Sequence, residues 1–112
     1  MKFIGKIRGM STQYVETGLE RLEIWINKSD AEGMPYELGE RVAINLIIGT
    51  KMFTAGLRAT ERTPYVWISP DLIDDDGYAV SLAEILQEHG FQKNQVVTLF
   101  FDFPDVWLEA VE

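Results

Sequence analysis

Residues 40 to 59 read ERVAINLIIGTKMFTAGLRA, and this stretch decides the fold. Two apolar runs flank Gly49-Thr50, and a two-residue loop that starts with glycine is a strong signal for a β-hairpin. Such a loop fixes the strand register, so that Ile48 lies opposite Lys51 and Val42 lies opposite Leu57. The sequence therefore predicts two antiparallel strands that turn at Gly49-Thr50.

The predicted register divides the side chains of the hairpin between two faces, because successive residues of a strand point to opposite sides. One face is apolar and is expected to belong to the core; it carries Val42, Ile44, Leu46, Phe53, Ala55 and Leu57. The other face pairs Arg41 with Arg58, Ala43 with Gly56, Asn45 with Thr54, and Ile47 with Met52. Like charges directly opposite each other are unfavourable, so the two arginines need an explanation.

More strands are expected on both sides of the hairpin. Alternation of apolar and polar residues predicts strands at 2–8 and 19–27, and a short strand is expected at 65–68, after Pro64. The apolar run at 96–103 predicts a central strand that ends at Pro104, and residues 106–108 are expected to dock as an edge strand or an ordered tail.

Little helix is predicted. The segment Ser69-Pro70-Asp71 resembles an N-cap followed by a first-turn proline and an acid, which predicts a single helical turn. Ser81 and Glu84 form a capping box, which opens a short helix near Leu82 to His89, and Gly90 follows as its left-handed stop.

These elements predict a single domain over residues 1–112 that is mostly β, in the α+β class. The expected architecture is a small antiparallel β-barrel or pseudobarrel of six to seven strands with one short helix, because strands dominate and short turns join them. A β-sandwich is the main alternative.

Composition narrows the function. The chain has no cysteine, which excludes disulfides and thiolate catalysis and fits a reducing compartment. It has no apolar run near the roughly 20 residues that span a bilayer and no signal peptide, so we expect a cytoplasmic protein without a membrane partner. The net charge of −8 favours solubility and opposes strong non-specific nucleic-acid binding, although it leaves room for a local basic patch.

Catalytic motifs are missing from the sequence. His89 is the only histidine, and its expected place at a helix end has a structural reason in the helix dipole. The acids Asp71 and Asp74–Asp76 lack the alternate spacing and the distal glutamate of an EF-hand, so a solvated turn is expected. We therefore predict that the protein is not an enzyme and needs no metal or cofactor.

One candidate binding site is defined by arginines on the second face of the hairpin. Arg41 and Arg58 edge a flat strip of small residues, Arg62 continues it if the strand runs on, and Lys51 at the turn is a further candidate. Such a strip could receive a phosphate backbone or a carboxylate. Alternatively, an acid such as Glu40 neutralises the arginines, or this face packs on another strand.

The segments 53–58 (FTAGLR), 65–70 (YVWISP) and 81–86 (SLAEIL), followed by Gly90 and Asn94-Gln95-Val96, form a hairpin, a short strand, a capped helix and a final strand. This order resembles the DNA-binding pseudobarrel domains of plant transcription factors and of restriction-endonuclease effector modules. The resemblance implies a barrel that binds DNA through flanking arms, and it assigns no contact residue in this chain.

Two binding functions follow. As a nucleic-acid module, the domain would use Arg41, Arg58 and Arg62 with Lys51, and Tyr65 and Trp67 could stack on bases unless they belong to the core. As an acidic protein-interaction module, it would use a sheet edge or its acidic surface to bind a protein partner or a second copy of itself.

Overall fold

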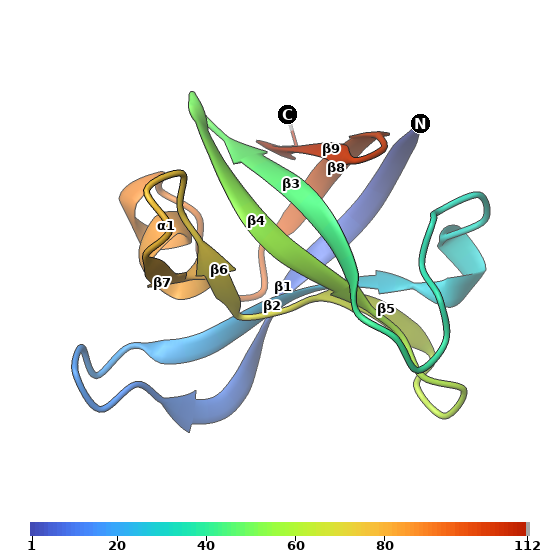
Figure 1. The fold of residues 1–112 in the computed structure, drawn as a ribbon. Helices are drawn as coiled ribbons and strands as arrows, with labels where there is room; N and C mark the ends of the chain where they lie inside the picture. Colours follow the sequence, from blue (N-terminus) through green and yellow to red (C-terminus); the bar gives the residue numbers. More distant parts are fainter. Residues whose placement is uncertain (112) are drawn as a thin grey trace.

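The structure, a computed structural model, describes residues 1–111 of the chain (Figure 1). Strands make up most of it, together with one short α-helix. In chain order the elements are β1 (Lys2–Gln13), β2 (Glu20–Asn27), a 3-10 turn (Lys28–Asp30), β3 (Val42–Ile48), β4 (Lys51–Arg58), β5 (Tyr65–Ile68), β6 (Asp71–Ile73), β7 (Ala79–Ser81), α1 (Leu82–Glu88), β8 (Val96–Asp102) and β9 (Asp105–Ala110).

Seven strands close into a barrel in the order β3-β9-β8-β1-β2-β5-β4, and β4 returns to pair with β3. The β3–β9 pair is parallel, whereas the other neighbouring pairs are antiparallel. The short strands β6 and β7 extend the sheet beyond β4. The predicted small, mostly β barrel with one short helix is therefore confirmed, with mixed strand directions, and the sandwich alternative is wrong.

The β3–β4 hairpin has the predicted register, from Val42 opposite Leu57 to Ile48 opposite Lys51. Gly49 adopts a φ of +63°, a conformation that glycine reaches without the steric cost of a Cβ atom. This is the conformation that a two-residue hairpin loop requires at its first central position. A local signal of two residues therefore fixes which side chains of both strands face the core.

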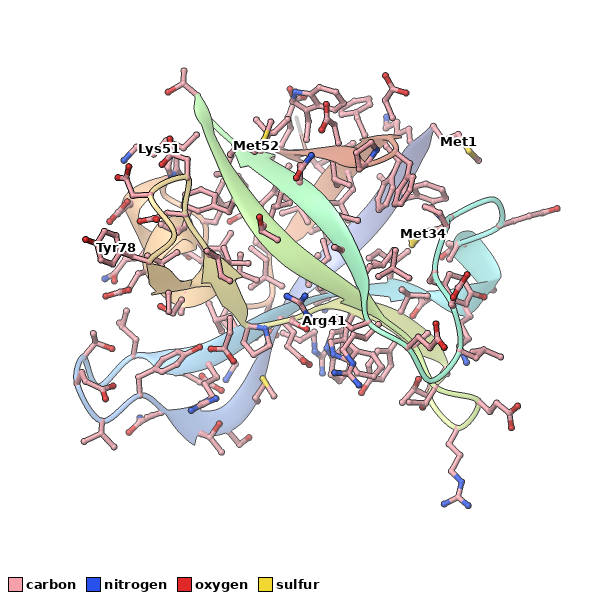
Figure 2. All side chains as sticks on the ribbon, viewed as in Figure 1. Met1, Met34, Arg41, Lys51, Met52 and Tyr78 are labelled. Atoms are coloured by element: carbon pink, nitrogen blue, oxygen red, sulfur yellow. The ribbon has the colours of Figure 1, made fainter. Side chains whose placement is uncertain are left out.

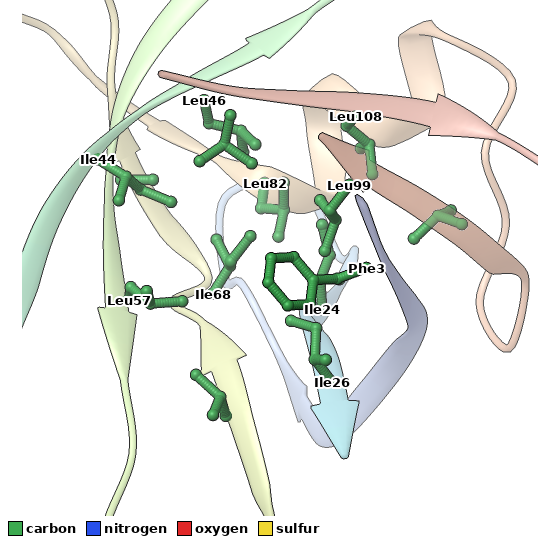
Figure 3. Close-up of a cluster of buried hydrophobic side chains, with 14 of the residues drawn as sticks. Phe3, Ile24, Ile26, Ile44, Leu46, Leu57, Ile68, Leu82, Leu99 and Leu108 are labelled. Carbon is green, nitrogen blue, oxygen red and sulfur yellow. The ribbon is translucent and has the colours of Figure 1, made fainter. Parts of the chain in front are cut away.

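The core fills the inside of the barrel, as the close-up in Figure 3 shows. Strands from every part of the chain contribute fully buried aliphatic side chains, and α1 adds Leu82 and Leu86. Burying such a side chain stabilises the fold by about 1.5–3 kcal/mol. The large residues with under 2% exposure are Ile7, Ile24, Ile26, Ile44, Leu46, Ile48, Leu57, Ile68, Leu72, Leu82, Leu86 and Leu99.

The helix α1 begins as predicted. The Ser81 hydroxyl accepts a hydrogen bond from the Glu84 backbone N–H at 3.1 Å, and Gly90 follows with a φ of +78°. His89 is the C-cap, and its Nδ1 lies 2.9 Å from the Ile85 carbonyl oxygen. The helix has seven residues, and the described part of the chain contains no helix long and apolar enough to cross a membrane.

Two local predictions are wrong. The expected helical turn at residues 69–71 is absent, because Asp71–Ile73 forms β6, which pairs with β4 and β7 and buries Leu72. Pairing with distant strands outweighs the N-cap signal of the local sequence. Likewise, residues 106–108 are neither a tail nor an edge strand, because β9 lies between β8 and β3 and closes the barrel.

The first strand is also longer than predicted. β1 continues past Arg8 to Gln13, with an irregular register between Gly9 and Gln13 where it pairs with β2. Figure 1 shows that the ends of β1 and β2 and the turn between them project from the barrel. The fold thus combines a closed barrel with one projecting arm.

Candidate nucleic-acid interface

Five side chains form a continuous row across the outside of the barrel. On neighbouring strands, Lys6 of β1 lies opposite Trp25 of β2, Trp25 opposite Trp67 of β5, and Trp67 opposite Arg58 of β4. The hairpin register, continued one residue beyond its last pair, places Arg41 opposite Arg58. We call Lys6, Trp25, Trp67, Arg58 and Arg41 the outer row.

Strand alternation explains why these side chains point outward. Their neighbours in sequence are buried core residues, such as Ile7 beside Lys6, Ile24 and Ile26 beside Trp25, and Val66 and Ile68 beside Trp67. Because side chains alternate along a strand, a position between two core residues lies on the outer face. Lys6, Arg58 and Arg41 are exposed, and the two tryptophans are partly exposed.

The aromatic centre of the outer row includes a third ring. Tyr65 stacks on Trp25 with ring centroids 3.7 Å apart and planes 8° apart, and it meets Trp67 edge-on at 5.8 Å. The Arg8 guanidinium carbon lies 5.1 Å from the centre of the Trp25 ring, within the range of a cation–π contact. Three rings therefore form one ordered cluster with a cation over it.

A carboxylate, Glu23, lies beside this cluster, two residues before Trp25 on the same face of β2. It is 7% exposed and accepts a hydrogen bond from the Trp25 indole N–H at 2.9 Å. Burial raises the pKa of Glu23, and the indole hydrogen bond works against that rise. Burial also raises the pKa of the Tyr65 hydroxyl, and the neighbouring Glu23 adds to the effect.

The two arginines of the hairpin lie on the same face, as the register predicts. Figure 2 shows Arg41 near the base of the hairpin. Its side chain passes directly over Gly56, where an added Cβ atom would come within 2.3 Å of the Arg41 Nε. A glycine at this position therefore leaves the room that the Arg41 side chain occupies.

No carboxylate of residues 1–111 lies within 4.0 Å of a charged nitrogen of the outer row. Within those residues, the ion pair at that distance joins Lys93 and Glu20, at 2.9 Å, elsewhere on the surface. The alternative that a nearby acid such as Glu40 neutralises the arginines is therefore not supported at contact distance. Arg41 and Arg58 are instead exposed, and the Arg41 side chain lies along the strip, over Gly56.

The other two predicted basic residues lie apart from the outer row. Lys51 is at the tip of the hairpin, where Figure 2 shows it distant from Arg41. Arg62 lies in the turn after β4, because that strand ends at Arg58 and does not run on as the prediction required. The two residues are exposed, but the strand register does not align them with the outer row.

Sequence reasoning identified Tyr65 and Trp67 as possible stacking residues and missed Lys6, Arg8 and Trp25. The alternation in 2–8 and 19–27 did show a basic side and an outward tryptophan. What it could not show is that β2 lies between β1 and β5, which brings these side chains next to Trp67. Lys6, Arg8 and Trp25 also line a groove of about 300 Å³, together with Asp30.

A second surface is acidic and lies between the turn of the arm and the residues of β6, β7 and α1 that face this turn. Glu16, Asp71 and Glu84 line a cleft of about 450 Å³, which we call the acidic cleft, and β7 runs along it with one side unpaired. The Tyr14 hydroxyl donates to the Asp71 carboxylate at 3.0 Å and to the Pro70 carbonyl oxygen at 3.2 Å. Burial, and then the contact with Asp71, raises the pKa of Tyr14 to about 12.

The three aspartates at Asp74–Asp76 lie close together in an exposed turn. One carboxylate oxygen of Asp74 accepts hydrogen bonds from the backbone N–H groups of Asp76 and Tyr78, at 3.0 and 2.8 Å. These bonds are the usual way in which aspartate stabilises a turn. They give Asp74 a structural role in the β6–β7 connection.

No protein-family model, curated protein or solved structure matches this chain. The resemblance to DNA-binding pseudobarrels therefore stays a prediction. Function has to follow from the geometry of the outer row and of the acidic cleft.

Proposed function

We propose that this protein is a non-catalytic nucleic-acid-binding domain that contacts its ligand through the outer row. The observation that carries the proposal is the order of side chains in that row: a cation, two aromatic rings and a second cation on four neighbouring strands, followed by Arg41 directly before β3. Nucleic acid presents the matching chemistry, because it alternates phosphate charges with flat bases.

The arginines suit phosphate for a geometric reason. A guanidinium donates in a planar fork that fits two phosphate oxygens at once, and Arg41 and Arg58 are exposed and have no carboxylate of the described residues within 4.0 Å. Repulsion between two neighbouring cations is relieved when an anion binds between them. Phosphate binding would therefore explain why two arginines occupy opposite positions on the hairpin.

The net charge of −8 opposes this function only at long range. At physiological ionic strength, charges further apart than about 8 Å are largely screened from each other. The local charge of the outer row therefore governs contact, whereas the overall charge suppresses binding elsewhere on the surface. We expect weak affinity outside the row and a strong dependence on salt.

The test is fluorescence anisotropy with labelled mixed-sequence oligonucleotides, single-stranded and duplex, at about 50 and 200 mM salt. Arg58→Ala should weaken binding at both concentrations. It should also reduce the slope of log affinity against log salt by about 0.7–0.9, because one phosphate contact is lost. Lys51→Ala is the matched control, since it removes an exposed cation outside the outer row.

Two outcomes contradict the proposal. One is that neither form of nucleic acid binds at the lower salt concentration. The other is that Lys51→Ala weakens binding as much as Arg58→Ala does, which would show that general charge and not the outer row is responsible.

The acidic cleft favours a second candidate function, binding of a protein segment. The unpaired side of β7 offers backbone hydrogen-bonding groups to an added strand, and Glu16, Asp71 and Glu84 would attract a basic one. Size-exclusion chromatography of the protein alone and titration with an extended lysine-rich peptide test this function. Self-association or peptide binding that Glu84→Gln weakens, without any nucleic-acid binding, would favour it over the first.

A further inference from the structure

We infer that the nucleic acid bound by the outer row is single-stranded. This inference rests on the proposed function and adds the class of ligand to it. Two features of the row favour a single strand over a duplex: its curved path around the barrel and the exposed aromatic ring at its centre.

The first feature is the path of the row around the barrel. The outer row crosses four of the seven strands that close the barrel, β1, β2, β5 and β4, and ends at Arg41, the residue before β3, so it follows a curved wall. The whole molecule measures only 36 × 30 × 29 Å. A DNA duplex has a persistence length of about 500 Å and stays nearly straight over that distance.

A straight duplex can touch a curved wall of this size at a few neighbouring phosphates only. Arg41 and Arg58 lie at one end of the row and Lys6 lies at the other, so a duplex could reach one end but not both. A single strand is flexible and can follow the wall from one end to the other. Curvature therefore favours a ligand that can contact all five positions together.

The second feature is the aromatic centre of the row. In a duplex the faces of the bases are stacked on one another and only their edges are reachable, whereas a single strand can place a base face on a protein ring. Trp67 is partly exposed, and Tyr65 meets it edge-on instead of covering its face in parallel. This ring therefore offers a face to a base.

At the other end of the cluster, the Trp25 ring is covered by other side chains in the free protein. Trp25 carries Tyr65 in parallel at 3.7 Å, and Arg8 lies over it at 5.1 Å. The Arg8 guanidinium can exchange its contact with the ring for a phosphate, because it has no carboxylate of residues 1–111 within 4.0 Å. A single strand of nucleic acid would thus place phosphates at Lys6 and Arg8, a base on Trp67, and further phosphates at Arg58 and Arg41.

Fluorescence anisotropy tests the inference with three ligands of equal length: a mixed-sequence single strand, the duplex of that strand, and an abasic single strand. We expect the single strand to bind more tightly than the duplex and the abasic strand to bind weakly. Trp67→Ala should lower affinity for the single strand on the order of ten-fold. Trp67→Phe should retain most of it, because phenylalanine keeps an aromatic face.

Trp107→Ala is the control, since Trp107 is an exposed tryptophan on β9, outside the outer row. Equal or tighter binding of the duplex, or equal binding of the abasic strand, overturns the inference and leaves the proposed function standing. Failure of every ligand to bind contradicts the proposed function itself. If Trp67→Ala does not fold, the comparison of the three ligands on the wild-type protein decides the matter.

Discussion

Glu23 affects both the candidate interface, through its hydrogen bond with Trp25, and the stability of the fold, through its buried carboxyl group. This residue is 7% exposed beside the aromatic cluster, and burial raises the pKa of its carboxyl group. The folded protein therefore holds this proton to a higher pH than the unfolded chain does. The contribution of Glu23 to stability is fully present below its unfolded pKa and is lost as the pH rises through its folded pKa.

Glu23→Gln should consequently raise the free energy of unfolding at pH 7. The amide carries no charge, and its oxygen can still accept the hydrogen bond from the Trp25 indole. The advantage over the wild type should shrink as the pH is lowered toward 4, because the wild-type carboxyl then becomes neutral as well. Urea unfolding at several pH values measures the difference, with the exposed Glu16→Gln as control. A constant difference across that range would contradict the assignment.

At the scale of elements, the β3–β4 hairpin separates core from surface by single residues. Phe53 is 3% exposed inside the barrel, whereas the adjacent Met52 is 45% exposed on the outer face. Phe53→Ala should reduce the free energy of unfolding by about 3–5 kcal/mol, because it removes a large buried side chain and leaves a cavity. Met52→Ala should change it by less than about 1 kcal/mol. Chemical denaturation of the two variants measures this contrast, and similar losses would mean that the register is wrong.

The same hairpin shows which elements a sequence can predict. Its turn, its register and its buried face follow from residues within twenty positions of each other, and so does the capped start of α1. The residues around Ser69 predict a helical turn and do not predict β6, because they do not reveal that this segment pairs with Thr54 of β4. A strand of three residues is too short to show an alternating pattern of its own, so the local sequence does not specify β6.

The candidate interface was predictable to the same extent. Arg41 and Arg58 share a face because one turn sets their register, so the sequence identifies them. Lys6 and Trp25 join them only through the strand order β1-β2-β5-β4, which depends on how the whole chain packs. Arg62 would join them only if β4 ran on past Arg58, and the sequence does not mark that the strand ends there.

At the scale of the whole molecule, closure of the barrel depends on β9. This strand pairs with β8 on one side and with β3 on the other, and it buries Val106 and Leu108. A chain that stops after Pro104 should therefore leave two open strand edges and an exposed part of the core. We expect this truncated protein to unfold at much lower urea concentration and to aggregate.

The control for this truncation is a chain that stops after Ala110, which keeps all of β9. Size-exclusion chromatography and urea unfolding compare the two proteins. A monomeric, cooperatively unfolding protein that lacks β9 would show that the other strands close without it.

The parallel pairing of β3 with β9 also has a consequence for synthesis on the ribosome. Asn45 and Asp105 are hydrogen-bonded through their side chains and are 60 residues apart in the chain. At translation rates of about 5–20 residues per second, β3 waits roughly 3–12 s before its partner has been made. During that interval β3 is paired with β4 on one side only, and its other edge stays open to wrong partners until the last strand of the barrel emerges.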